Sequence, residues 1–392
     1  MSKELKLPIY LDHHATTPLD PRVLEAMMPF FTECFGNAAS KNHAFGREAH
    51  RAVEAAREIL AASINARPQD ICFTSGATES INLAIKGLFH AGGKTPQHFI
   101  TVVTEHPAVL DSFRRIASEG AEVTCLPVDA QGMLDPGQVA GAIRPETKMV
   151  SVMAANNEIG VIQPLKEIGA ICREHDIFFM TDAAQALGNI PLDVQALNID
   201  LLACSAHKIY GPKGIGALYC RRGNPKVPLA PMMDGGGHER GLRSGTLNVP
   251  GIVGFAKAVE ISLQEMKTGQ ARLRGLRDAL YQSLREGIPG LRINGHPDQR
   301  LAGNLNVCIP GIVSETLIIA LAHDVALSTG STCTTAAVEP SHVLKALGLS
   351  SDDAQASVRI GLGRHTNAAE VEHAAHAIVE QVARLRGLAS SH

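Results

Sequence analysis

Lys208 is the residue of this 392-residue chain that is best placed for covalent chemistry. It follows the apolar run 201–203 and lies in the sequence S-A-H-K-I-Y-G-P-K-G, among small and polar neighbours. A lysine just past the carboxyl end of a buried strand can form a Schiff base with the carbonyl group of a cofactor. The ordinary interpretation of a single lysine is a surface loop residue, so the case for Lys208 depends on its surroundings.

Asp182 and His106 follow two other apolar runs in the same way. Asp182 comes after 177–180, and a carboxylate there needs a cation, which a protonated pyridine nitrogen would supply. The competing interpretation of Asp182 is a helix N-cap, a common role for aspartate. His106 comes after 99–103, where an imidazole can stack on a cofactor ring or transfer protons.

A phosphate site is indicated by the sequence T-S-G-A-T-E-S at 74–80, which follows the run 71–73 and precedes a helical stretch. A glycine-containing turn at a helix N-terminus offers free N–H groups to a phosphate, and Ser75 and Thr78 add hydroxyls. An ordinary capping box gives the same sequence, and the motif is neither a Walker A nor a dinucleotide fingerprint. Each motif has a common structural explanation. Together, however, these four strand ends match a pyridoxal phosphate (PLP) site.

These motifs need a scaffold that brings strand ends together. Short apolar runs alternate with amphipathic stretches, which predicts an α/β fold with a mostly parallel sheet covered by helices. The last third predicts a smaller α+β domain. Its predicted helices are 270–286 and 368–388, and its predicted strands are 291–294 and 305–309. The strands of the main sheet are predicted at 71–73, 99–103, 149–153, 177–180, 201–203 and 215–219, and its helices at 78–89, 107–118, 164–174 and 250–266.

Composition excludes several other classes of protein. The chain has 36 basic and 39 acidic residues and a formal net charge of -3, which argues against nucleic acid as a partner. It has no Trp and four Tyr, too few aromatic rings for a surface that stacks sugars or bases. Neither an apolar signal region nor a membrane-spanning run is visible, so a soluble, cytoplasmic protein is expected. The eight cysteines form no C-x-x-C pair, and no metal site is expected.

With these motifs in place, the sequence resembles the cysteine desulfurases of the NifS/IscS class, which are fold-type I PLP enzymes of the class V aminotransferase family. The resemblance runs from Tyr10 to about Thr366, nearly the whole chain. The matching segments are Y-L-D-H-H-A-T-T-P at 10–18, F-G-N-A-A-S at 35–40, S-G-A-T-E-S at 75–80, T-E-H at 104–106, N-N-E-I-G at 156–160, T-D-A-A-Q at 181–185, S-A-H-K at 205–208, G-G-G-H-E-R-G at 235–241, R-S-G-T at 243–246, S-T-G-S-T-C-T-T at 328–335 and R-I-G-L-G-R at 359–364.

The resemblance implies a role for each matching residue. It implies a large PLP-binding domain over 17–263 and a small domain of 1–16 and 264–392, with the catalytic cysteine loop at about 326–338. The implied PLP contacts are Lys208 as the covalent lysine, Asp182 at the pyridine nitrogen, Gln185 and Asn157 at the ring oxygen, His106 stacked on the ring and transferring protons, Ala77 (backbone), Thr78, Ser205 and His207 at the phosphate, and Thr246 at the phosphate of the other subunit of a homodimer. The implied substrate contacts are Arg359 at the carboxylate and Asn37 as its assistant.

Cys333 decides the expected activity. Its neighbours are small and hydroxylated, and such a stretch packs poorly and tends to form a mobile loop. An exposed thiol on a flexible loop can reach a substrate sulfur, whereas Cys204 and Cys308 have the apolar neighbours of buried cysteines. The resemblance implies that L-cysteine is converted to L-alanine and that Cys333 becomes a persulfide. The sulfur would then pass to an acceptor protein such as an iron–sulfur scaffold.

Two alternatives have distinct signatures. A selenocysteine lyase or another PLP β-lyase would share the fold, but it would not need an enzyme thiol such as Cys333 in the same way. A non-catalytic partner-binding subunit would be free to lose Lys208 or Cys333, and both are present. The chain also departs from the family. It has Thr332 before the cysteine, Ala38 after the G-N pair, and His13-His14 where the family more often has Asn or Tyr and then Asn, Ala or Ser. Its C-terminus resembles the shorter NifS type, which weakens the expectation of a standard scaffold partner.

Overall fold

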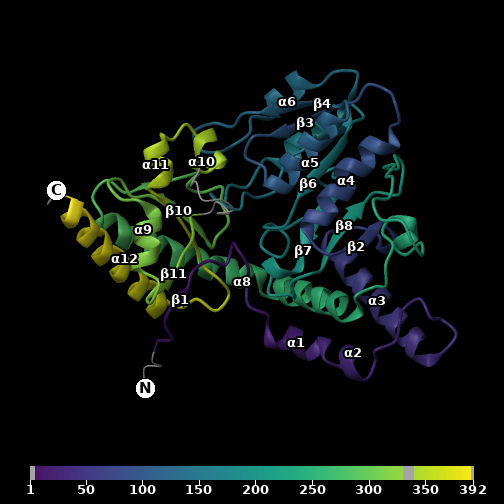
Figure 1. Cartoon of the computed structure of the whole chain (residues 1–392), viewed down its shortest axis with the longest axis horizontal. Helices are drawn as coiled ribbons and strands as arrows, with labels where there is room; N and C mark the ends of the chain where they lie inside the picture. Colours follow the sequence, from purple (N-terminus) through teal and green to yellow (C-terminus); the bar gives the residue numbers. More distant parts are fainter. Residues whose placement is uncertain (1–4, 330–339, 390–392) are drawn as a thin grey trace.

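The computed structural model describes residues 5–329 and 340–389, and Cys333 lies outside these described residues. Two layered assemblies of sheet and helix make up the described chain, and α8 (Val249–Gly287) runs between them (Figure 1). One is built on a seven-stranded sheet and the other on a three-stranded sheet. The predicted α/β fold is therefore confirmed.

The seven-stranded sheet brings together the segments that carry the sequence motifs. All neighbouring pairs are parallel except those of β8, which is antiparallel to both of its neighbours. The strand order across the sheet is β2 (Ile71–Thr74), β8 (Gly216–Cys220), β7 (Leu201–Ser205), β6 (Phe178–Asp182), β5 (Thr147–Ser151), β3 (His98–Val102) and β4 (Glu122–Leu126).

Helices cover both faces of this sheet, which explains the nearly continuous apolar runs of its inner strands. In β7, Leu201 and Ala203 pack into the core on the side of α4 (Ala77–Ala91) and α5 (Pro107–Ser118). Leu202 and Cys204 pack into the core on the opposite face. The elements on that second face are α3 (Ala44–Ser63), α6 (Pro136–Ala142), α7 (Leu165–Glu174) and the first half of α8, with α1 (Pro21–Met27) packed against α8.

The second assembly joins the two ends of the chain. Its antiparallel sheet has the order β12 (Ser357–Gly361), β10 (Asn304–Cys308) and β9 (Arg292–Ile293). The N-terminal β1 (Ile9–Tyr10) pairs in parallel with β11 (Val325–Ala326).

The remaining elements of the described chain, from both assemblies, are α2 (Pro29–Thr32), α9 (Ser314–Ala320), α10 (His342–Ala346), α11 (Ser351–Gln355), α12 (Ala368–Ala389) and the short 3-10 helices η1 (Pro68–Asp70), η2 (Ala206–Lys208) and η3 (Glu239–Gly241).

One predicted break is absent from the structure. The sequence predicts separate helices over 250–266 and 270–286, whereas α8 is continuous over 39 residues. The intervening M-K-T-G-Q contains a glycine but no proline, so the backbone hydrogen bonds continue through it. The long helix therefore connects the two assemblies directly. Within the part of the chain that the structure describes, no helix is long and apolar enough to cross a membrane.

Candidate active site

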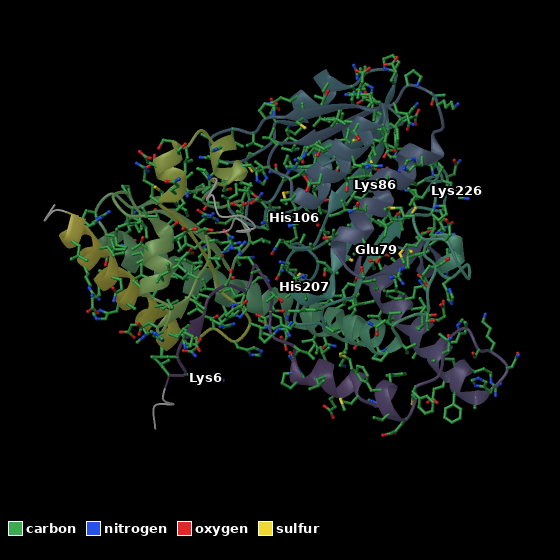
Figure 2. The ribbon with its side chains drawn as sticks, viewed as in Figure 1. Lys6, Glu79, Lys86, His106, His207 and Lys226 are labelled. Carbon is green, nitrogen blue, oxygen red and sulfur yellow. The ribbon has the colours of Figure 1, made fainter. Side chains whose placement is uncertain are left out.

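A cleft of about 1200 Å³ lies where the parallel strands end, between the two assemblies. Its walls come from the loops after β2, β3, β5, β6 and β7 and from β12. His106 and His207 lie at this junction in Figure 2. The sequence-predicted residues that line the cleft are Ala77, Thr78, His106, Asn157, Asp182, Gln185, Ser205, His207, Lys208 and Arg359.

Lys208 ends η2, directly after β7, and its side chain contacts the N-terminal segment. Its Nζ donates to the main-chain oxygens of His14 and Ala15, both at 2.6 Å. Burial, together with the nearby Arg359 guanidinium, lowers the pKa of Lys208 to about 8. About a tenth of the amine is therefore neutral and nucleophilic at pH 7, far more than for a lysine with the ordinary pKa.

Asp182 ends β6 and is buried, with 5% of its surface exposed. Its Oδ1 accepts a hydrogen bond of 2.8 Å from the amide of Ala184, so the turn-capping role that aspartate often has is present here too. Burial raises the pKa of this carboxyl, while His106 and Lys208 act in the opposite direction. A cation placed against the free oxygen would stabilise the ionised form, as a pyridinium nitrogen requires.

His106 is the N-cap of α5 and holds one defined tautomer. Its Nδ1 accepts a hydrogen bond of 3.1 Å from the amide of Ala108, so the neutral ring carries its proton on Nε2. Burial is the main cause that lowers the pKa of this imidazole. His106 is therefore neutral at physiological pH and presents an N–H donor on Nε2.

The phosphate cradle forms at the N-terminus of α4, where Gly76 provides no side-chain cap. The Glu79 carboxylate accepts from the amide of Ser75 at 2.7 Å, but no Ser or Thr hydroxyl of the described residues caps the helix, so only half of the alternative capping box is present. Arg243 pairs with Glu79 at 2.8 Å and neutralises its charge beside the cradle. A Cβ atom on Gly216 would lie 2.6 Å from the Gly76 Cα, so β8 closes the cradle from behind. These groups leave the first-turn amides to an anion.

His207 and Ser205 form the other side of the cradle. The His207 Nδ1 lies 3.1 Å from the Thr16 hydroxyl, which ties it to the N-terminal segment. Burial and the charges of Lys208 and Lys213 lower the pKa of His207 to about 4, so the imidazole is neutral. A phosphate here meets hydroxyl and imidazole groups together with amides of the helix N-terminus.

Arg359, on β12, brings the second assembly into the cleft. Its guanidinium donates to Asp12 at 2.8 Å and to the main-chain oxygen of Asn157 at 3.0 Å. Its Nε is buried and has no hydrogen-bond partner among the residues that the structure describes. The Ser328 hydroxyl donates to the same Asp12 carboxylate at 2.9 Å, and the main chains of Ser328 and Arg359 form an antiparallel β-bridge. Arg359 is therefore held in a defined orientation, with its positive charge at the wall of the cleft.

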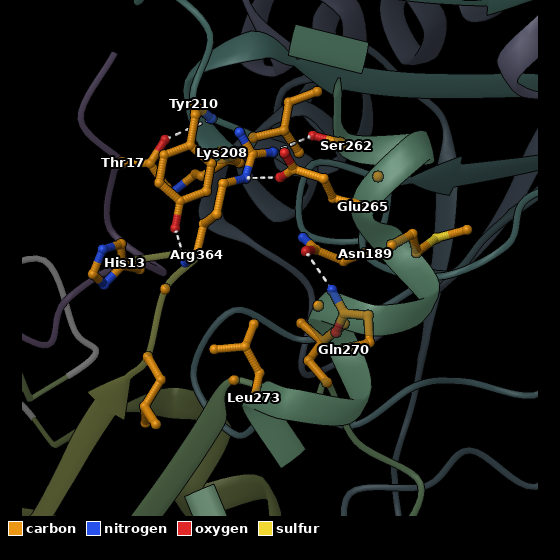
Figure 3. Close-up of a pocket in the computed structure, with 18 of the residues that line it drawn as sticks. His13, Thr17, Asn189, Lys208, Tyr210, Ser262, Glu265, Gln270, Leu273 and Arg364 are labelled. Atoms are coloured by element: carbon orange, nitrogen blue, oxygen red, sulfur yellow. Dashed lines mark hydrogen bonds and ion pairs between the residues drawn. The ribbon is translucent and has the colours of Figure 1, made fainter. Parts of the chain in front are cut away.

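A smaller cavity of about 80 Å³ lies on the other side of Lys208, beside α8 (Figure 3). Arg364 crosses it, pairing with Asp20 at 2.8 Å and with Glu265 at 3.0 Å. Its guanidinium lies over the Tyr210 ring, 4.4 Å from the centroid, and the Tyr210 hydroxyl accepts from the Arg364 amide. These contacts fix the Lys208 segment against α8 and against the loop after β12.

Two predicted residues are not brought into this cleft, and a third lies outside the described residues. Thr246 is exposed and does not line it. Asn37 is also exposed, and its Oδ1 accepts from the amide of Ala39 at 2.9 Å in a local turn. Cys333 lies outside the described residues, although Ser328 and Pro340, close to it in sequence, line the cleft. The roles of all three stay predictions.

Several cleft residues were not assigned a role from the sequence. Asp12 and His14 enter from the N-terminal segment, and Glu158 and Ser341 pair at 2.5 Å on the opposite wall. The sequence contains one indication of a functional role for Asp12, His14 and Glu158, which is that they lie in segments that resemble the cysteine desulfurases. Their positions depend on contacts between residues that are more than one hundred positions apart, which local patterns do not contain.

The donor set suits PLP in three ways. A helix N-terminus with hydroxyl groups is matched to its phosphate, a buried carboxyl to its pyridine nitrogen, and a lysine with a lowered pKa to its aldehyde. Asp182 and the first turn of α4 both face the same cleft, so one ligand can reach both of them. The side chains present therefore fit the cofactor.

Comparisons with known proteins agree with this geometry. The family model of aminotransferase class-V matches residues 9–373. The cysteine desulfurase IscS of Anaeromyxobacter dehalogenans (strain 2CP-C) is 53% identical over 382 residues, 97% of this chain and 94% of that protein. IscS of Rickettsia typhi (strain ATCC VR-144 / Wilmington) is 50% identical over 386 residues, 98% of this chain and 94% of that protein.

Solved structures show the same relationship. A NifS-like protein superposes with a TM-score of 0.90 at 37% identity, covering 96% of this chain and 100% of that one. SspA in complex with cysteine superposes with a TM-score of 0.81 at 37% identity, covering 92% and 100%. The chain therefore belongs to the class-V aminotransferase family of PLP-dependent enzymes, and within it to the cysteine desulfurases of the NifS/IscS class.

Proposed function

We propose that this PLP-dependent cysteine desulfurase transfers the sulfur of L-cysteine to Cys333. The reaction breaks the Cβ–S bond of the substrate, forms an S–S bond on Cys333 and adds a proton to the carbon, which leaves as L-alanine. One observation supports this most directly. Lys208, His106, Asp182 and Arg359 line one cleft, and the residues on either side of the Cys333 segment line the same cleft. The solved complex of the relative SspA contains cysteine.

Each side chain in the cleft has a role in the reaction that follows from its position. PLP, when bound, supplies the electron sink that makes the substrate's Cα–H and Cβ–S bonds breakable. Arg359, oriented by Asp12 and by the main-chain oxygen of Asn157, holds the substrate carboxylate at the cleft wall. The Lys208 amine, released when substrate binds, takes up and returns the Cα proton, for which its pKa of about 8 is suited. His106 donates from Nε2, the nitrogen that carries its proton.

The thiol of Cys333 must be ionised to attack sulfur. Positive charge favours a thiolate, and the Arg359 and Lys208 cations face this cleft. We propose that these two charges lower the pKa of Cys333 when it enters the cleft. The persulfide would then pass to an acceptor protein, such as one that assembles iron–sulfur clusters. The cytoplasmic location stays a prediction from the sequence.

We also propose that the enzyme works as a homodimer. Three large aromatic side chains are exposed around α2 and the start of α3, namely Phe31, Phe35 and Phe45, with 56%, 64% and 50% of their surface accessible. Phe35 and Phe45 stack on each other with ring centroids 5.3 Å apart. Exposed apolar patches of this kind mark interfaces. A second copy of the chain would cover them and would bring a Thr246 to the phosphate cradle across the interface.

Substitution of Cys333 tests the proposed sulfur transfer. Cys333→Ser should keep bound PLP, and release of alanine from L-cysteine should fall by several orders of magnitude, as removal of a covalent nucleophile does elsewhere. Lys208→Ala should instead lose the absorption band of lysine-bound PLP. Cys125→Ser, which alters an exposed cysteine outside the cleft, is the matched control and should keep full activity. Full alanine release by Cys333→Ser would show that another group accepts the sulfur.

A further inference from the structure

His14 lies in the segment that leads from β1 into the large sheet assembly, and it is buried with 8% of its surface exposed. Its contacts converge on two residues of the cofactor site. Its main-chain oxygen accepts from the Gln185 Nε2 at 2.9 Å and from the Lys208 Nζ at 2.6 Å. Its ring Nδ1 lies 3.1 Å from the Gln185 Oε1. The Gln185 amide is therefore held at both of its ends by one residue.

The donors and acceptors of this pair can be assigned without ambiguity. A main-chain carbonyl only accepts, so the NH₂ group of Gln185 must face the His14 oxygen. The amide oxygen then faces the imidazole, and an amide oxygen also only accepts. His14 must therefore carry a proton on Nδ1 and donate it to Gln185. The other ring nitrogen, Nε2, is buried and has no hydrogen-bond partner among the described residues.

The imidazole stays neutral in this position. Burial is the largest influence, and the nearby Arg359 and Lys208 charges act in the same direction, which lowers the pKa of His14 to about 3. The hydrogen bond to Gln185 and the main-chain oxygen of Gly303 raise the pKa but do not outweigh these influences. The single ring proton is therefore held on Nδ1 over the whole physiological pH range, and the pair does not act as a pH switch.

This arrangement leaves one amide hydrogen of Gln185 free. An NH₂ group has two hydrogens, and only one is directed at the His14 oxygen. Gln185 lines the cleft on the same wall as Asp182. The geometry points to His14 as a positioning residue: it locks the orientation of the Gln185 amide so that its second N–H faces the ring oxygen of PLP. This inference rests on the role proposed for Gln185.

The side-chain chemistry at position 14 allows a matched test. In an asparagine, Nδ2 is as many bonds from Cβ as Nδ1 is in a histidine, so it can donate to the same amide oxygen. Alanine and leucine offer no donor. The main-chain oxygen remains in every variant, so substitutions at 14 remove only the imidazole contact.

The test is a spectrophotometric pH titration of PLP bound to Lys208, measured on the holoenzyme. A donor at the ring oxygen favours its ionised form and lowers the pKa of the chromophore. His14→Leu, which fills the space without a donor, should raise the titration midpoint by about one pH unit, equivalent to about 1.4 kcal/mol. His14→Asn should stay within a few tenths of a unit of the wild type. PLP content per chain should be unchanged in both variants.

A double-mutant cycle separates the two assignments. In a Gln185→Ala background, His14→Leu should produce no further shift, because the amide that it positions is gone. If Gln185→Ala moves the midpoint and His14→Leu does not, or if His14→Asn shifts it as far as His14→Leu, the inference about His14 is wrong and the role of Gln185 stands. If Gln185→Ala leaves the midpoint unchanged, the proposed contact of Gln185 fails and the inference fails with it. His14→Ala, checked for PLP content, gives a second donor-free variant.

Discussion

The charge environment of Lys208 determines when it can react with a carbonyl. Its amine is buried, and Arg359 repels a proton on it, while Asp182 and Asp12 favour one. The balance lowers the pKa, so the neutral amine is available about two pH units earlier than for a free lysine. A carbonyl-binding lysine needs this property, because only the neutral amine is a nucleophile.

The rate at which the cofactor-free protein takes up PLP should therefore rise with pH and level off with a midpoint of about 8. Below that pH the amine is protonated and unreactive, and above it the amine is already free. Arg359→Gln should move the midpoint upward, because a repulsive charge is lost and Asp12 is released from its ion pair. Rates of appearance of the lysine-bound band, measured from pH 6 to 10, test this.

Lys213→Gln serves as the control for Arg359→Gln. Lys213 also lines the cleft, but it is not among the charges that shift Lys208. Its removal should leave the midpoint unchanged. A wild-type midpoint near 10 would mean that Lys208 is solvated like an ordinary surface lysine, and the proposed electrostatic role of Arg359 would be wrong.

At the scale of elements, local patterns predicted the inner strands well and the connections poorly. Strands buried on both faces are short apolar runs, so the runs ending near Asp182 and Lys208 coincide with β6 and β7 to within a few residues. β4 (Glu122–Leu126) was missed because it lies at the edge of the sheet, is partly exposed and has no continuous apolar run. The site depends on the same rule. Groups at strand ends were predicted, whereas Asp12 and His14 enter from a distant segment.

The continuity of α8 can be tested at Gly269, the glycine in its interior where a break was predicted. A Cβ there would meet no atom within 4 Å, so Gly269→Ala should stabilise the protein. The expected increase is about 0.5–1 kcal/mol, from the helix propensity of alanine and the smaller entropy of its unfolded chain. Urea denaturation followed by circular dichroism measures the change.

Gly254→Ala, on the same helix, is the matched control. A Cβ there would lie 2.5 Å from the sulfur of Met27, the last residue of α1, which packs against α8. The same substitution should therefore be destabilising at 254 and stabilising at 269. Destabilisation at both positions would indicate that α8 is bent or interrupted near 269 in solution.

At the scale of the whole molecule, the loop that carries Thr246 is anchored to the large sheet assembly by two ion pairs. The buried pair Arg57–Glu239, at 2.8 Å, holds it against the start of β2, and Glu239 also accepts from the amide of Phe73 at 2.8 Å. Arg243 holds the loop to Glu79 beside the phosphate cradle. Thr246 is nevertheless exposed and does not line the cleft of its own chain. Such anchoring around an exposed hydroxyl is consistent with a role across a dimer interface.

Subunit mixing distinguishes a contact across the interface from one within the chain. Thr246→Ala should weaken PLP binding by about 10- to 100-fold, the value of one hydrogen bond to a charged group. Lys208→Ala should be inactive. In a mixed dimer, the site with an intact Lys208 would receive its threonine from the Lys208→Ala chain and would be complete. Mixing equal amounts of the two variants, followed by unfolding and refolding together, should restore about a quarter of the sites, because half of the dimers are mixed and each has one complete site.

The measurement is alanine release at a PLP concentration too low to fill the Thr246→Ala site. If Thr246 instead contacts the phosphate of its own chain, every site in the mixture has at least one defect and mixing gives no gain. An affinity tag on the Lys208→Ala chain, captured after the same treatment, reports through the amount of co-captured Thr246→Ala chain how completely the subunits exchange. Recovery in the variant mixture, together with exchange in this control, would establish that each site is built from two chains. The stacked Phe35 and Phe45 would then lie where the two chains meet, and Phe35→Asp should separate the subunits and weaken PLP binding to the same extent as Thr246→Ala.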